Sequence, residues 1–399
     1  MRIMKLRTHH TLRQRRARGF SLVEILVGVA IGVVGMLVIF KTIATWDTHT
    51  RSTTAGSDAQ STGSLAMFNL ERDIKQAGLG FMGIGAVTPP ASLGCLVNVA
   101  DSGVRSLPFT PFNMVPVQIV LNPGQPDTIN ILYGNSPFFV SEEQFTASTS
   151  TSKTLARRNG FKPGDLAIAA VGTNCNLLEV TGDTNADGKT IDHTDAATYP
   201  NFYAVPAANK VARYNSAALP AIGALGNIYS LGPLPRRDSW AVDTVRGSLT
   251  NSELFGGAPA FVVGEGVVNM KAIYGLDTLG VLGTRTVNAW TNVAPTTPAG
   301  WAQVLSVRVA MLVRSRQFER TIDQSASGVP TGVTQVQPTW SGAAPLLAIP
   351  NSDFVMTNVD GTLDSFGPNN PDPNNWRYYR YRVYEKEIPL RNVMWGMTP

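Results

Sequence analysis

Few side chains in this sequence have the chemistry of catalysis or of transition-metal binding. The candidates are His9, His10, His49, His193, Cys95 and Cys175. A zinc site needs a cluster of such ligands, and a catalytic thiol or hydroxyl needs a histidine beside it. Neither His49 nor His193 lies near a nucleophile-elbow motif. We therefore predict that the protein is not an enzyme and has no catalytic residues.

Oxygen ligands for a hard cation occur in one short segment. Asp183, Asn185 and Asp187 alternate before Gly188, which reproduces the start of an EF-hand loop. Position 12 of such a loop, where a bidentate glutamate belongs, would be Thr194. The segment is either a calcium-binding turn of another type or a surface turn, for which Asn, Asp and Gly are typical. Calcium is the one candidate cofactor.

The longest apolar run lies near the N-terminus. Residues 20–40 read FSLVEILVGVAIGVVGMLVIF, with Glu24 as the only charge and Lys41 directly after them. As a helix they extend about 31 Å, which matches the hydrocarbon core of a bilayer and exceeds the apolar region of a secretory signal. We predict a retained membrane-spanning helix. The residues before the helix include several basic side chains and no acidic ones, which places the N-terminus in the cytoplasm.

Glu24 is the unusual residue of this run. A carboxylate in a spanning helix is unfavourable unless it reaches the interface or meets a cation in the same layer of low dielectric constant. Gly19 and Phe20 precede it in the sequence GFSLVE, which follows a basic leader. This arrangement resembles the signal of type IV prepilins and of type II secretion pseudopilins.

The resemblance implies a processing step and a set of partners. A prepilin peptidase would cut between Gly19 and Phe20 and methylate the new amine of Phe20. Glu24 would pair with the N-terminal amine of a neighbouring subunit during filament assembly. Other minor and major pilins and the assembly machinery of the bacterial inner membrane would be the partners. The head would be periplasmic first and would reach the cell surface in the pilus.

The net charge of +5 comes entirely from the leader. Residues 1–19 hold seven basic groups and no acidic ones, which leaves 26 basic against 28 acidic residues in 20–399. The charge therefore indicates the orientation of insertion, and it does not indicate a nucleic-acid partner.

A disulfide between Cys95 and Cys175 is favoured on this topology, because thiols outside the cytoplasm oxidise. The alternative is two separate buried thiols. Only one pairing is available, since the chain has two cysteines.

The helix is predicted to continue through residues 41–80. No proline occurs before Pro89, and Ala66, Leu70, Ile74 and Ala77 form an apolar stripe of helical spacing. Residues 48–64 are rich in Ser, Thr and Gly, so they are either helical because of their neighbours or a hinge.

Residues 81–399 have the pattern of a β-rich head. Period-two runs predict strands at 127–133, 165–171, 267–274, 304–314 and 377–384. The predicted class is α+β, with a long N-terminal helix packed on an antiparallel sheet, and the predicted regions are a leader at 1–19, a spanning helix at 20–40, its continuation at 41–80, and the head. Segments 286–300 and 320–375 are candidate long loops. Inserted loops or a second lobe are expected within 100–300.

Three patches narrow the resemblance. ERDIKQAGLG, SVRVAMLVRSR and YRYRVYEKEIPLRNVMW are similar to PilW-type minor pilins of the type IV pilus, in the order of that family. The resemblance implies a pilin-like fold and a subunit that helps to initiate or cap the filament. The alternatives are a J-type pseudopilin of type II secretion and a pilus-tip adhesin or receptor.

One more pattern has two readings. Arg377, Arg380 and Arg382 alternate with aromatic residues, as in surfaces that stack on single-stranded nucleic acid. We favour a strand with tyrosines on one face and arginines that pair with Glu385 and Glu387 on the other.

Overall fold

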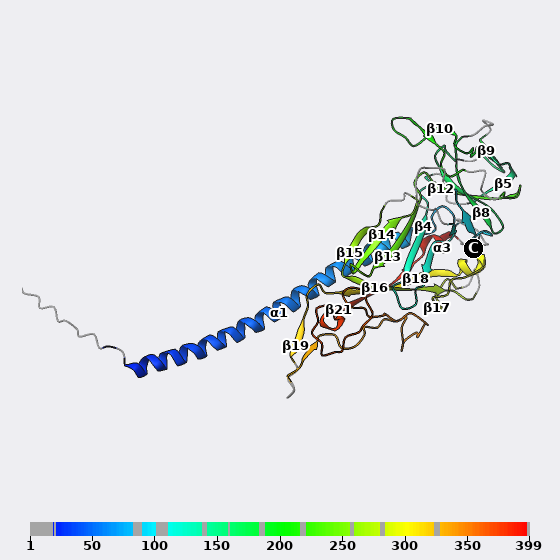
Figure 1. Cartoon of the computed structure of the whole chain (residues 1–399). Coiled ribbons are helices and arrows are strands. Elements are labelled where there is room, and N and C mark those ends of the chain that lie inside the picture. The colour runs from blue at the N-terminus through cyan, green and yellow to red at the C-terminus, as the bar shows by residue number, and fades with distance from the viewer. Residues whose placement is uncertain are drawn as a thin grey trace, which may run out of the picture. The chain divides into compact units, whose positions relative to one another are not determined.

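The computed structural model describes most of the chain, in two compact units, Met1–Thr54 and Ala55–Pro399 (Figure 1). The described residues are 19, 21–82, 90–100, 111–137, 142–158, 160–182, 188–215, 221–255, 259–279, 284–322 and 328–396. Helix α1 (Leu22–Gln76) runs through the boundary between the units.

Helix α1 is 55 residues long, and it includes the Ser/Thr/Gly-rich residues 48–64 without a break. It contains no proline, so no backbone N–H within it is missing. Gly78 follows it with φ of +84°, and its N–H donates to the carbonyl of Leu132 at 2.9 Å. A left-handed glycine after the last turn is a common end of a helix.

The head contains two antiparallel sheets that pack on the second part of α1. One has the order β15–β14–β13–β4–β3 and the other the order β17–β16–β18–β21. Their strands are β3 (Val117–Val120), β4 (Thr128–Tyr133), β13 (Arg236–Asp243), β14 (Ser248–Glu253), β15 (Phe261–Glu265), β16 (Val267–Leu276), β17 (Ala289–Thr291), β18 (Val304–Arg314) and β21 (Tyr381–Pro389).

A third sheet has the order β2–β1–β8–β7–β12–β5–β6–β9, and the described residues of the head also form two small hairpins and three short helices. The sheet consists of β1 (Leu96–Asn98), β2 (Phe112–Asn113), β5 (Glu143–Ser148), β6 (Ser152–Leu155), β7 (Leu166–Val171), β8 (Asn174–Glu179), β9 (Thr190–Asp192) and β12 (Gly226–Gly232). The other elements are β10 (Thr198–Asn201), β11 (Ala208–Val211), β19 (Arg320–Ile322), β20 (Pro330–Gly332), α2 (Pro298–Ala302), η1 (Trp376–Tyr378) and α3 (Arg391–Gly396).

The predicted α+β class is confirmed. The strand pairs are antiparallel except that between β1 and β8, and the apolar stripe of α1 is buried in the core. Ala66, Leu70, Ile74 and Ala77 have no exposed surface. They pack with residues of β3, β4, β16 and β18 in one apolar cluster.

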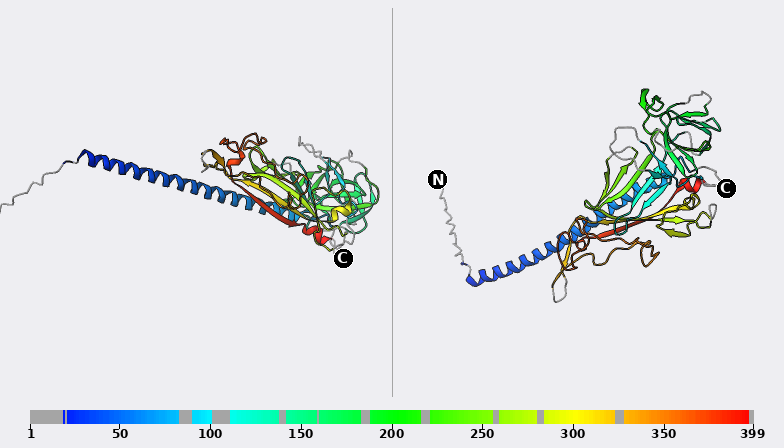
Figure 2. Two further views of the ribbon diagram at one scale, coloured as in Figure 1. Left: turned by 90° about the horizontal axis from the view of Figure 1, so that it is seen from below. Right: turned by 45° about the vertical axis from the view of Figure 1, so that its right-hand side comes forward.

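Strand β21 runs beside the second part of α1 (Figure 2). Polar contacts also join the two elements. The Tyr384 hydroxyl donates to the carbonyl of Gln60 at 3.0 Å, and Lys386 Nζ lies 2.7 Å from a carboxylate oxygen of Glu71. The ring of Tyr384 fills the space where a Cβ on Gly63 would stand. Gly63, a weak helix former, therefore allows the close approach of β21 to the helix.

Strands β4 and β13 are neighbours although about a hundred residues separate them. Tyr133 lies opposite Arg236, and residues 134–235, which we call the insertion, form most of the third sheet. The two ends of the insertion are tied together, since Asn135 N–H donates to Leu231 O at 2.7 Å and Leu234 N–H donates to Asn135 Oδ1 at 2.9 Å. The insertion has an apolar cluster of its own, which includes Phe145, Leu155, Phe161, Leu178 and Ile191.

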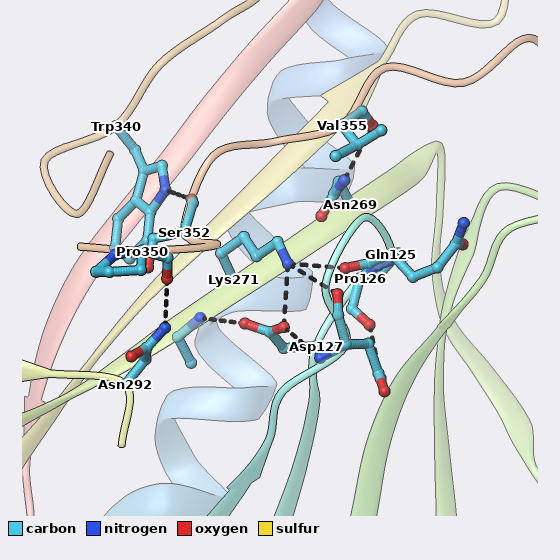
Figure 3. Close-up of polar contacts among 12 residues, drawn as sticks. Gln125, Pro126, Asp127, Asn269, Lys271, Asn292, Trp340, Pro350, Ser352 and Val355 are labelled. Atoms are coloured by element: carbon cyan, nitrogen blue, oxygen red, sulfur yellow. Dashed lines mark hydrogen bonds and ion pairs between the residues drawn. The ribbon is translucent and has the colours of Figure 1, made fainter. Parts of the chain in front are cut away.

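A buried ion pair joins the β3–β4 turn to the four-stranded sheet (Figure 3). Lys271 Nζ lies 3.1 Å from Asp127 Oδ1 and donates to the carbonyls of Gln125 and Asn122 at 2.8 and 3.3 Å. Asp127 also accepts from the N–H groups of Asn122 and Ala272. Both side chains are buried, so each charge depends on the other and on these hydrogen bonds.

Segment 333–375, within a predicted long loop, is a packed layer on the four-stranded sheet. Trp340 is buried with Phe354, and its Nε1 donates to Ser352 O at 2.6 Å. The amides of Asn292 and Asn269 donate to Pro350 O and Val355 O, which holds the segment against β16 and β17 (Figure 3). The segment has almost no regular structure, yet apolar burial orders it.

The expected strand at 377–384 was partly wrong. Trp376–Tyr378 form a 3-10 turn, and β21 begins at Tyr381. Arg377 pairs with Asp364 and Arg380 with Glu319, instead of the expected carboxylates. Those carboxylates, Glu385 and Glu387, lie beside Arg308 on β18. Cross-strand pairing selected the partner, because β18 lies next to β21.

Candidate assembly site

The first part of α1 has an apolar surface that nothing in its unit covers. Leu22–Ile43 have a mean hydropathy of 2.7 and none of this stretch is buried, and among the described residues it is the one helix long and apolar enough to cross a membrane. A helix that is apolar on all sides requires a lipid or protein environment. At 1.5 Å per residue its length, about 33 Å, is that of a bilayer core.

Glu24 lies in the first turn of this helix. Ser21 caps the turn: its carbonyl accepts from the N–H groups of Glu24 and Ile25 at 3.0 and 3.2 Å, and its Oγ lies 3.3 Å from Glu24 N. The positive end of the helix dipole favours an acidic side chain here. The Glu24 side chain is exposed, and in the described part of the chain it forms no ion pair.

The predicted cleavage junction is described in part. Gly19 is exposed, and no atom lies within 4 Å of the position of a Cβ on it. Phe20 lies outside the described residues. Gly28, Gly32 and Gly35 also have open space at the Cβ position. Gly28 and Gly32 share a helix face, where a neighbouring helix can approach closely.

The second part of α1 is amphipathic. Leu70 and Ile74 face the head, whereas Leu65 and Phe68 are 56% and 59% exposed. Near these residues Glu71 accepts hydrogen bonds from Lys386 and Lys75. The two hydrogen bonds hold the pKa of Glu71 below its usual range, and the bond from Lys386 has the larger effect. One face of this part of the helix therefore packs against the head, and the opposite face has apolar side chains that are exposed to other molecules.

The disulfide that the sequence favoured is present. Cys95 and Cys175 are joined, with 6.1 Å between their Cα atoms. Cys95 precedes β1 and Cys175 lies in β8, where the two strands pair in parallel. Because Cys175 belongs to the insertion and Cys95 does not, the bond ties the insertion to the rest of the head.

The candidate calcium ligands Asp183, Asn185 and Asp187 lie outside the described residues. In the parts of the chain that the structure describes, no group of three or more His, Cys, Asp or Glu side chains could hold a metal ion. His193, a candidate metal ligand in the sequence, is buried, and its Nε2 lies 2.8 Å from Lys153 Nζ. Burial lowers the pKa of His193 to about 4 and that of Lys153 to about 8.

Sequence reasoning missed a buried acidic residue on α1. Asp73 lies beside a cavity of about 420 Å³ and accepts a hydrogen bond from Trp240 Nε1 at 3.2 Å. Burial, and then the nearby charge of Asp238, raise the pKa of Asp73 to about 6. The helical spacing contained a signal, because Asp73 is seven residues after Ala66 and four before Ala77, on the buried face.

Two family models match the chain. Residues 14–40 match the prokaryotic N-terminal methylation motif, and residues 246–392, a little over a third of the chain, match PilW, the type IV pilus-assembly protein W. No match was found among curated proteins or among solved structures. The second match spans β16, β18 and β21, and the insertion lies outside both matches.

These families are structural and not enzymatic, and they imply interactions with other pilins and with the pilus machinery. The methylation motif and the exposed apolar helix together indicate a membrane-anchored protein. The two matches are consistent with a PilW-type pilin and support a relation to the type IV pilus.

Proposed function

We propose that this chain is a non-catalytic minor pilin that helps to initiate or cap the type IV pilus. Prepilin peptidase cuts between Gly19 and Phe20 and methylates the amine of Phe20. The helix stays in the bacterial inner membrane with the leader in the cytoplasm and the head in the periplasm. It then enters the filament beside other minor and major pilins.

The observation that carries this proposal is the exposed apolar helix with Glu24 in its first turn. Removal of the leader creates an amine at Phe20, about 6 Å of helix rise from Glu24. In an apolar layer a carboxylate and an ammonium group attract each other far more strongly than in water. The Phe20 amine of one subunit is thus a suitable cation for Glu24 of the next.

Deletion of the gene and complementation with variants test the proposal. We expect the deletion strain to lose surface pili and to keep type II secretion, and Glu24→Gln to restore few pili although the protein is made. Asp353→Asn, a matched change at an exposed carboxylate of the head, should restore piliation fully. Loss of secretion with normal piliation would instead support a J-type pseudopilin.

The insertion favours a second role, as a tip adhesin or receptor. Residues 134–235 lie outside the PilW match and carry their own apolar cluster. In the β10–β11 hairpin and its turn, Phe202 and Val205 are exposed. If the insertion binds a ligand, a Phe202→Ser, Val205→Ser chain should keep piliation and lose adhesion to host cells. Unchanged adhesion would contradict the second role and would support the architectural role only.

A further inference from the structure

A second cleft in the head, of about 290 Å³, lies where three segments of the sheets end. Arg246 and Ser248 come from the β13–β14 turn and the start of β14. Glu265 ends β15, and Arg314 and Arg316 lie at and just after the end of β18. All of these residues belong to the head and to the PilW-matched part of the chain.

Positive charge exceeds negative charge in the walls of this cleft. Arg316 pairs with Glu265, the one carboxylate of the lining. Arg246 has only a distant partner, since its Nε lies 3.9 Å from Asp243 Oδ2. Among the described residues no carboxylate pairs with Arg314, whose guanidinium lies over the ring of Tyr379, 5.3 Å from the centroid. Arg314 also hydrogen-bonds with Tyr381. Neither Arg314 nor Arg246 is thus held by a close carboxylate among the described residues, and each has N–H donors left for an anion.

A buried hydroxyl without a partner lines the same cleft. Ser248 is 2% exposed, and within the described structure its Oγ makes no hydrogen bond. A buried polar group in this state is unfavourable, and native proteins rarely retain one without a reason. The hydroxyl can donate to a ligand oxygen.

The backbone around the cleft is specialised to place Arg314. Gly247 and Gly266 have φ of +59° and +83°, which disfavours other residues. A Cβ on Gly247 would lie 3.3 Å from Arg314 Nη2, and one on Gly266 would lie 2.8 Å from Arg314 O. Gly247 thus leaves room for the guanidinium of Arg314, and Gly266 for its backbone carbonyl.

We propose that this cleft is an oxyanion site that binds a phosphate ester. Guanidinium groups bind phosphate with two parallel hydrogen bonds, and phosphate oxygens accept from more donors than the two oxygens of a carboxylate. Arg314, Arg246 and the Ser248 hydroxyl are the donors that the lining residues supply. The cleft is larger than a phosphate ion, so it has room for part of the alcohol, either a soluble metabolite or a lipid headgroup.

Isothermal titration of the full chain in a nonionic detergent tests this proposal. The probes are inorganic phosphate, glycerol phosphate, short-chain phosphatidylglycerol and acetate, at matched ionic strength. We expect saturable binding of the phosphates and about tenfold weaker binding of acetate. Tighter binding of the phosphatidylglycerol than of glycerol phosphate would identify a lipid source, and equal binding a soluble one. Binding of acetate as tight as phosphate, or no saturation, would overturn the proposal.

Variants connect the binding to the cleft. Arg314→Gln should weaken phosphate binding about tenfold or more, and Ser248→Ala severalfold. Arg314→Lys keeps the positive charge but cannot donate the two parallel hydrogen bonds of a guanidinium group, so it should weaken phosphate binding to an intermediate degree. The matched control is Arg380→Gln, an exposed arginine outside the cleft that pairs with Glu319. Thermal melting in chloride verifies folding of each variant. An equal loss in Arg380→Gln, or no loss in the Arg314 variants, would contradict the site.

Discussion

The first part of α1 and the head differ in whether their apolar side chains are buried and their charged side chains are paired. Leu22–Ile43 expose their apolar side chains on every side, and Glu24 has no described partner within the chain. In the head Leu70 and Ile74 are fully buried, and buried Lys271 is paired with Asp127. The buried stripe is thus covered by the head, whereas the first part of α1 leaves its apolar surface for lipid or other subunits. Changes in the two regions should therefore have different consequences.

The largest effect on stability is expected at the buried ion pair. Lys271→Met leaves the Asp127 carboxylate buried without its cation, which should lower the free energy of unfolding by about 3–5 kcal/mol. Guanidinium unfolding of the full chain in detergent, followed by near-UV circular dichroism, measures this change. The double variant Lys271→Met, Asp127→Asn should recover much of the loss. A double variant as unstable as Lys271→Met alone would show that the charge is not the cause.

A matched pair of leucine changes separates the two parts of α1. Leu70→Ala removes a fully buried side chain and should cost about 2–5 kcal/mol of head stability. Leu37→Ala, on the exposed apolar part, should change the same unfolding transition by less than about 0.5 kcal/mol. Equal effects would mean that the apolar part is also packed within the chain.

Much of the fold could be predicted because it depends on local periodicity. The stripe of Ala66, Leu70, Ile74 and Ala77 and the strand 304–314 were both identified from spacing. The stripe is buried as expected, whereas the strand, expected to be buried on one face, is buried on both. The pairing of β4 with β13 could not be predicted, because the insertion separates the partners and nothing local marks them. For the same reason the partners of Arg377 and Arg380, Asp364 and Glu319, were missed.

The candidate assembly residues were predictable from a short motif, whereas the buried polar residues were not. Gly19, Phe20 and Glu24 lie within six consecutive residues, so the motif can be recognised from the sequence alone. Ser248, Arg246 and Arg314 meet only because β14 and β18 end at the same place. Clefts built from distant strands need the tertiary fold to be found.

A smaller, pH-dependent effect is expected at Asp73. Because the folded state raises its pKa from 3.8 to about 6, this residue contributes stability below pH 4 that is lost as the pH rises through 6. Asp73→Asn should remove this dependence and stabilise the head at pH 8 by about 1–3 kcal/mol. Unfolding measured between pH 4 and 8 checks the prediction. An unchanged pH profile would contradict the assignment to Asp73.

The smallest effect is expected at the surface contact between β21 and α1. Lys386→Met removes the first of the two hydrogen bonds that lower the pKa of Glu71 and should cost about 0.5–1 kcal/mol at pH 7. The wild-type contribution is present at neutral pH. It declines as the pH falls below about 4.5, where the unfolded chain binds the proton first, and it is lost as the pH falls through the lower pKa of Glu71 in the folded state. The difference between variant and wild type should therefore shrink at pH 3. A difference independent of pH would indicate lost packing of the Lys386 stem.

The central claim, that the exposed helix is released by processing for assembly, has one direct test. Intact-mass and N-terminal peptide analysis of the membrane-bound chain should show a chain that begins at Phe20 with one added methyl group. Gly19→Trp should abolish this product and leave the leader attached. A wild-type chain that retains residues 1–19, or a Gly19→Trp chain still processed to Phe20, would contradict the account.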